Sequence, residues 1–148
     1  MTHPRRISLP FAVLVVAVLL TGCGPSAAVG LHEAPASLEP ITGSDHHRIA
    51  LTERAAERIG IEVVAVESGD AATAPGMTNV PYSALLYDPD GLTFVYVNPE
   101  PLVFVREDVE VDRIEGDAAI LSAGPEVGTM VVSVGAAELL GTESEIGH

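Results

Sequence analysis

Short apolar runs separated by turn-forming residues dominate the chain after residue 80. Within residues 93–98, Phe94 and Tyr96 fall on one face of an extended strand. Val95 and Val97 fall on the other face, because successive side chains of a strand point to opposite sides. Further strands are expected at residues 82–87, 103–111, 118–121 and 129–134. This spacing is typical of strands joined in hairpins.

One helix is predicted, over residues 52–59. Thr52 suits the N-cap position, and Glu53 places negative charge in the first turn, where the helix dipole favours it. Gly60 stands where a left-handed C-terminal residue is expected. Strands are predicted on either side, at residues 48–51 and 61–66. A two-turn helix is not stable alone in water, so it must pack on the strands.

Residues 68–78 carry no helix or strand pattern and predict a loop of about a dozen residues, which is uncommon inside a compact domain. A single helical turn is expected at residues 136–140. The chain is therefore predicted to be mainly β: a small antiparallel barrel or sandwich of six or seven strands with one short α-helix.

The first 22 residues have the layout of a secretory signal peptide. Arg5 and Arg6 are followed by an apolar run of about 14 residues, which is too short for a comfortable membrane span of roughly 20. Leu20, Thr21 and Gly22 then precede Cys23, the only cysteine in the chain. This stretch resembles the lipobox of bacterial lipoproteins, in which the chain is cut before the cysteine and a diacylglycerol is attached to its sulfur.

The resemblance implies an acylated (palmitate-type) lipid on Cys23, which would hold the protein at the extracytoplasmic face of the cell membrane. An ordinary secretory signal, or an uncleaved anchor with an incidental cysteine, is the alternative. The predicted organisation is a signal peptide over residues 1–22, a flexible tether over 23–47, a β domain over 48–141 and a disordered tail over 142–148. The tether is assigned from its Gly, Pro, Ser and Ala content.

Charge excludes one class of partner. The chain has a formal net charge of −14 and no lysine, and removal of residues 1–22 takes away two arginines and leaves −16. Nucleic-acid binding needs a basic patch, so nucleic acid is not an expected partner. The acidic body is also expected to be repelled by anionic lipid headgroups.

Asp45, His46 and His47 form the one cluster with metal-ligand chemistry. Zinc sites need three or four ligands, and the other histidines of the mature chain lie near its ends. The alternative is a solvated linker, and no cofactor is expected. Asp88, Pro89, Asp90 and Gly91 predict a hairpin turn, because the positions after them lack the Gly and Glu of a calcium-binding EF-hand loop. No catalytic motif is present, so the protein is not expected to be an enzyme.

Two stretches resemble a known family. Residues 49–61 are similar to a segment of the periplasmic adaptor subunits (membrane fusion proteins) of RND-type efflux pumps that precedes their hairpin domains. Residues 80–97 are similar to the opening of the membrane-proximal domain of those adaptors, most closely in the run from Val80 to Leu85. Residues 109–136 continue the likeness with a Gly-containing turn, a Val-Val strand and a Gly-Ala step.

The resemblance covers most of residues 49–140 and implies a stand-alone membrane-proximal domain. A full adaptor carries a barrel, a lipoyl domain and a coiled coil between these stretches, whereas only residues 68–79 lie between them in this chain. The function implied is a lipid-anchored binding module that docks on a membrane transporter or another envelope protein. The alternative is a lipoprotein that binds a small ligand or a metal.

The lipid anchor gives the first testable prediction. Cells that express the full chain and are fed a labelled fatty acid should incorporate the label into the wild-type protein and not into Cys23→Ala, because the thiol is the acylated group. The measurement is the label in the immunopurified chain. Absence of label from the wild type would contradict the anchor.

Overall fold

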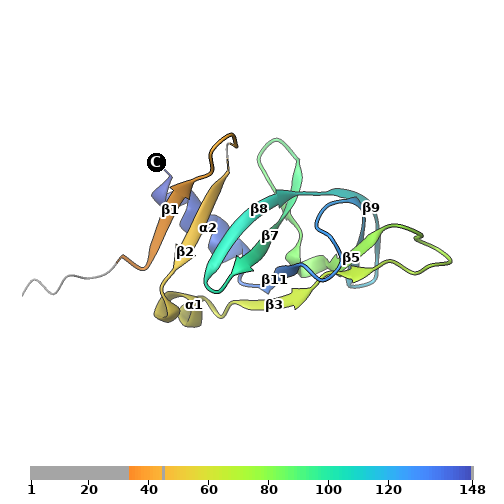
Figure 1. The fold of residues 1–148 in the computed structure, drawn as a ribbon, viewed down its shortest axis with the longest axis horizontal. Helices are drawn as coiled ribbons and strands as arrows, with labels where there is room; N and C mark the ends of the chain where they lie inside the picture. Colours follow the sequence, from red (N-terminus) through yellow and green to blue (C-terminus); the bar gives the residue numbers. More distant parts are fainter. Residues whose placement is uncertain (1–33, 45, 148) are drawn as a thin grey trace, which may run out of the picture. The chain divides into compact units, whose positions relative to one another are not determined.

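The computed structural model describes residues 34–44 and 46–147. Of these residues 47% lie in strands and 19% in helices, and eleven strands form two antiparallel sheets accompanied by two α-helices (Figure 1). The predicted mainly β, antiparallel class is confirmed. Neither sheet closes on itself, which corresponds to the sandwich alternative of the prediction.

The larger sheet has seven strands. Six of them lie in the order β1 (Ala36–Pro40), β2 (His47–Leu51), β8 (Val103–Asp108), β7 (Thr93–Glu100), β11 (Met130–Val134) and β3 (Glu62–Ala65). The seventh, β6 (Leu86–Tyr87), pairs with the first residues of β7. The smaller sheet has the order β4 (Glu67–Ser68), β5 (Thr78–Pro81), β10 (Ala118–Ala123) and β9 (Glu110–Glu115).

Two segments run from one sheet into the other. The chain passes from β3 to β4 through Val66 and from β8 to β9 through Val109. Both valines are buried, with exposed fractions of 1% and 6%, and belong to the apolar cluster between the sheets. A strand that bends at a single residue turns the corner of a sandwich without leaving the core.

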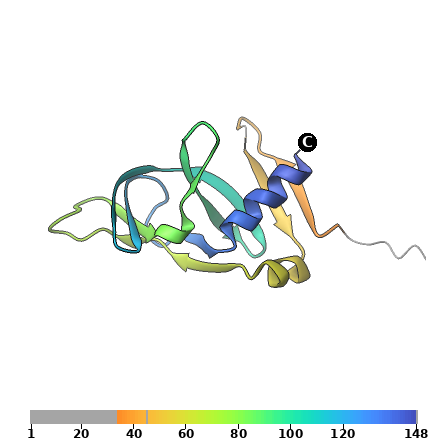
Figure 2. The ribbon, with the colours of Figure 1, turned by 180° about the vertical axis from the view of Figure 1, so that it is seen from behind.

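Strand β7 is covered on both faces. Phe94 and Tyr96 belong to the cluster shared with the helices, and Val95 and Val97 belong to the cluster between the sheets. The predicted assignment of these four residues to opposite faces is thus confirmed. The larger sheet is the middle of three layers, and Figure 2 shows helix α2 (Ala136–Ile146) crossing the sheet on the outer side.

The predicted two-turn helix is confirmed as α1 (Glu53–Ile59). The Thr52 side chain accepts a hydrogen bond from the Ala55 N–H at 3.3 Å, as an N-cap should. Gly60 adopts a left-handed conformation with φ of 74° and donates its N–H to the Ala56 carbonyl, which ends the helix.

The predicted tether is too long. Residues that were assigned to it form β1, whose ladder with β2 runs from Ala36 opposite Leu51 to Pro40 opposite His47. Ala36 is buried at 8% exposure and belongs to the cluster under the helices. The Gly- and Pro-rich composition of the surrounding segment obscured this short strand. Residues 23–33 and Asp45 of the predicted tether lie outside the described residues.

The predicted disordered tail over residues 142–148 is also wrong, because α2 continues to Ile146. Leu139 is fully buried, and one turn later the same face carries Glu143, which is only 8% exposed. Because the charged Glu143 occupies a buried position, the apolar residues alone do not show the helical period over this segment. Gly135 begins the helix at φ of 84°, where a Cβ would lie 2.8 Å from Ile61 Cδ1.

Glu143 is buried because its carboxylate has two partners on the sheet. The Tyr96 hydroxyl donates to Glu143 Oε2 at 2.6 Å, and Arg106 Nε donates to the same oxygen at 2.7 Å. The Arg106 guanidinium also lies 4.4 Å from the centre of the Phe94 ring. Burial and the neighbouring carboxylate raise the pKa of Tyr96 well above its ordinary value, so the phenol stays a donor. These contacts fix α2 to the sheet.

Other local predictions have mixed outcomes. The hairpin turn after β6 is confirmed: Asp88 Oδ1 accepts from the Asp90 and Leu92 N–H groups at 2.9 and 2.8 Å. The strand predicted over residues 93–98 is longer than expected, because β7 continues through Pro99 to Glu100. The number of strands was underestimated: β1, β4 and β5 were not predicted, and β8 and β9 were predicted as one strand. The predicted strand over residues 82–87 is a short 3₁₀ helix, η1 (Tyr82–Ala84), followed by β6.

Replacement of Glu143 tests whether α2 belongs to the fold. We expect Glu143→Ala to lower the free energy of unfolding by about 2–3 kcal/mol, since it leaves the Tyr96 hydroxyl and Arg106 without their partner. Tyr96→Phe should cost about 1 kcal/mol. The measurement is urea unfolding of the purified chain. The matched control is Glu145→Ala on the exposed side of α2, which should change stability by less than about 0.5 kcal/mol. Equal effects of the two glutamate variants would contradict the docked helix.

Candidate functional site

Two of the three predicted metal ligands, His46 and His47, lie among the described residues. His46 Nε2 lies 3.5 Å from Asp108 Oδ1, and His47 begins β2 opposite Pro40. No third carboxylate, histidine or cysteine joins them: among residues 34–44 and 46–147, no three such side chains are grouped as a metal site requires. Cys23 and Asp45 lie outside the described residues. In that same part of the chain, no helix is long and apolar enough to cross a membrane.

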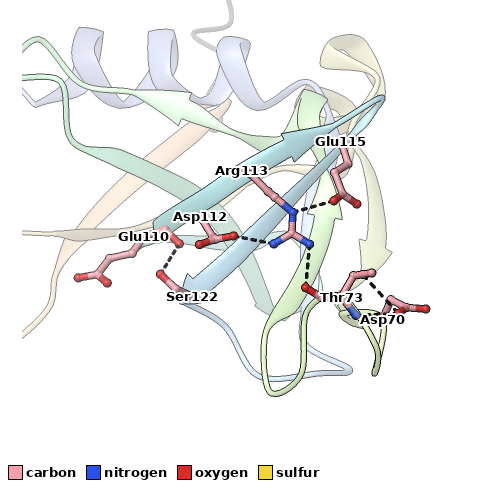
Figure 3. Close-up of polar contacts among 7 residues, drawn as sticks. All are labelled: Asp70, Thr73, Glu110, Asp112, Arg113, Glu115 and Ser122. Carbon is pink, nitrogen blue, oxygen red and sulfur yellow. Dashed lines mark hydrogen bonds and ion pairs between the residues drawn. The ribbon is translucent and has the colours of Figure 1, made fainter.

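The unpatterned segment at residues 68–78 proves to be the connection between β4 and β5. Within it, Asp70 Oδ1 accepts a hydrogen bond from the Ala72 N–H at 2.8 Å. The same oxygen accepts from the Thr73 N–H at 3.0 Å (Figure 3). These bonds hold the pKa of the Asp70 carboxyl below its ordinary value. Ala74 is buried at 1% exposure. The loop therefore has a defined conformation of its own.

Arg113 on β9 joins this loop to the smaller sheet. Its guanidinium contacts Asp112 Oδ2 and Glu115 Oε1, both at 2.6 Å, and donates to the Thr73 carbonyl at 3.1 Å (Figure 3). The two flanking carboxylates raise the pKa of Arg113, so the cation is permanent. The acidic cluster here is occupied by its own arginine, and its role is to hold the loop.

A pair of tyrosines is exposed beside the hairpin between β6 and β7. Tyr82 in the short 3₁₀ helix η1 (Tyr82–Ala84) is 47% exposed, and Tyr87 in β6 is 53% exposed. Desolvation and the neighbouring Tyr82 phenol raise the pKa of Tyr87, so the two hydroxyl groups lie near each other. Leu92, at the far end of the hairpin turn, is 63% exposed. Figure 1 shows this hairpin (light green) extending away from the strands.

The local sequence pattern does not distinguish these two tyrosines from Tyr96. Tyr96 is fully buried, whereas the other two are about half exposed. The Ser83 hydroxyl donates to the Ser133 carbonyl at 2.8 Å and fixes η1 against β11. The tyrosine pair is therefore presented to solvent by a well-anchored segment.

A cleft of about 420 Å³ opens between β3 and β5. Its walls are mostly apolar, from Val64, Ala65, Val80 and Pro81. Its polar or charged lining residues are Glu67, Asn79 and Asp117. Nothing in the sequence pattern pointed to it, because it forms between strands of different sheets.

Removal of the Arg113 side chain tests its role. We expect amide hydrogen exchange at Ala74 and Met77 to become several-fold faster in Arg113→Ala, because the loop loses its link to β9. Arg58→Ala, at an arginine on α1, is the control and should leave these amides unchanged. Acidification should loosen the same loop. The lowered pKa of Asp70 means that its stabilising effect is complete above about pH 4 and is lost as the pH falls through the lowered value. Unchanged exchange in Arg113→Ala would contradict the assignment.

Comparisons of the chain with known proteins identify no related protein. The chain matches no protein-family model, and no curated protein or solved structure is significantly similar to it. The arguments about function therefore depend on the residues and their geometry.

Proposed function

We propose that this chain is a lipid-anchored binding module at the extracytoplasmic face of the cell membrane, which docks on a membrane transporter or another envelope protein. The lipobox-like stretch before Cys23 supports the anchor. The likeness of residues 49–61 and 80–97 to the membrane-proximal domain of efflux adaptors supports the docking role. Only residues 68–79 lie between the two similar stretches, where a full adaptor carries the parts that build a tunnel, so the proposed role is attachment rather than conduction.

The observation that carries the proposal is the short distance along the chain between the anchor and the folded body. Strand β1 begins at Ala36, only 13 residues after Cys23. Thirteen fully extended residues span about 45 Å, compared with roughly 80 Å for the tether expected from composition. The lipid would then hold the start of β1 within this distance of the bilayer, which favours an integral membrane protein as the partner.

The tyrosine pair is the docking surface that we propose. Tyrosine is enriched among the residues that contribute most to protein interfaces, because it buries a large rigid ring and keeps a hydroxyl for a hydrogen bond. Tyr82 and Tyr87 are adjacent, about half exposed and anchored through η1. The acidic charge of the body favours a partner whose contacting face is basic.

A second candidate function is the small-ligand-binding lipoprotein, and the cleft between β3 and β5 favours it. Its volume of about 420 Å³ lies in the range of ligand pockets, roughly 300–1,000 Å³. The metal-binding form of this alternative has little support. Among the described ion pairs His46 has only Asp108 as an acidic neighbour, and a zinc site needs three or four ligands.

Site-specific photo-crosslinking tests the docking proposal in cells that express the full chain. A benzophenone amino acid at position 87 should give an adduct with an integral membrane protein. The same probe at Glu57, exposed on α1, should not. Tyr82→Ala should lower the yield from position 87 by about fivefold or more, the effect of removing an interface anchor worth about 1 kcal/mol.

Membrane attachment is tested in the same experiment. Cys23→Ala should abolish the adduct, because the body is no longer held near the bilayer. Mass spectrometry of the adduct identifies its class. Equal adducts from positions 87 and 57, or a partner that is captured equally well by Cys23→Ala, would contradict the proposal.

A further inference from the structure

We infer that the cleft between β3 and β5 is a binding site for a small organic cation with an apolar body, such as an aryl-alkyl amine. The inference is independent of the docking proposal and stands on the shape and charge of the cleft. Three observations carry it: the way the strands part, the composition of the walls and the state of the carboxylates.

The cleft opens because a hydrogen-bonded ladder ends at a proline. Strands β4 and β5 pair with Glu67 opposite Asn79. Hydrogen-bonded pairs alternate along an antiparallel ladder, so the next such pair would join Ala65 to Pro81. Pro81 has no N–H to donate, so the ladder cannot continue there. Ala65 instead lies opposite Met130 in the larger sheet. The strands therefore diverge on either side of Val66, and the space between them is the cleft.

Backbone polar groups of β3 face this space. Val66 donates its N–H to the Thr129 carbonyl at 2.8 Å and accepts from the Gly128 N–H at 2.9 Å. Backbone groups point to alternate sides along a strand, so those of Ala65 point away from β11, towards the cleft that Ala65 lines. They offer a ligand both a donor and an acceptor.

The walls suit an apolar body. Val64, Val80 and Pro81 line the cleft, and Val80 is buried at 1% exposure in the cluster between the sheets. Strand β5 is held by β4 on one side and by β10 on the other, which keeps this wall in place. An apolar surface with a few fixed polar groups is typical of small-molecule sites.

The charge at the cleft selects a cation. Glu67 and Asp117 are both exposed carboxylates, and neither takes part in any of the ion pairs found among residues 34–44 and 46–147. The chain around them is strongly acidic, with a net charge of −14. Carboxylates at the mouth of an apolar cleft attract cations and repel anions of the same size. Asn79 is a further polar residue of the same lining.

Three probes with one apolar body and different charges test the site: naphthylmethylamine, naphthylmethanol and naphthylacetate. The protein is the isotopically labelled full chain in nanodiscs of zwitterionic lipid, and empty nanodiscs correct for partitioning into lipid. The measurement is two-dimensional amide NMR. The amine should shift the amide signals of Ala65, Asn79, Val80 and Ala118. The alcohol should bind more weakly, and the acetate should not bind.

Two variants separate the charge from the cavity. Glu67→Gln combined with Asp117→Asn should weaken amine binding by about fivefold and leave the alcohol unchanged, since two partly screened carboxylates are removed. Glu57→Gln combined with Glu145→Gln removes the same charge elsewhere and should have no effect. Ala65→Phe, which fills the mouth of the cleft from an exposed position, should abolish binding of both probes.

Several results would overturn the inference. They are absence of any amine-induced shift at these amides, equal affinity for the three probes, and equal weakening by the cleft and control glutamine variants. Loss of docking in the crosslinking experiment would not affect it. If the inference is overturned, the cleft holds only water and salt ions. Its carboxylates then serve only to keep the open edge of β3 from pairing with other chains.

Discussion

The fold depends on one strand that must be covered on both faces. Every residue from Phe94 to Val97 is buried, with exposed fractions between 0% and 8%. An apolar strand of this kind needs a layer on each side, because leaving either face in water would cost roughly 1.5–3 kcal/mol for each large side chain. The smaller sheet covers Val95 and Val97, and the helices cover Phe94 and Tyr96. Three layers in about 110 described residues follow from this requirement.

The features proposed for function lie where this layered structure stops. The ladder between β4 and β5 ends at Pro81, and the cleft begins there. The tyrosine pair stands beside the hairpin where β6 pairs with only the first residues of β7. Sheet interiors leave no free backbone groups or side chains for a partner, so recognition is confined to such edges. The rigid core fixes the position of these edges without contributing to them directly.

Sequence patterns predicted the elements whose signals are local. Alternation identified both faces of β7, and the caps at Thr52 and Gly60 located α1. Only the first part of α2 was predicted, because its buried stripe goes on to include Glu143, whose burial makes sense only with Tyr96 and Arg106 opposite it. The cleft was not predictable for a similar reason. It depends on which residue of β3 lies opposite Pro81, and that register is set by pairing between distant parts of the chain.

The few positive charges decide which carboxylates remain free. The chain has no lysine, and three of its arginines pair with acids of the described body: Arg48 with Glu100, Arg106 with Glu143, and Arg113 with Asp112 and Glu115. Each of these pairs joins elements or fixes a strand, so the arginines are committed to structure. Glu67 and Asp117 at the cleft are in none of the ion pairs of the described residues, and the body around them is acidic overall. The excess of acidic residues makes the whole surface negative. A cation with an apolar body is selected only where carboxylates without an arginine partner adjoin an apolar cleft.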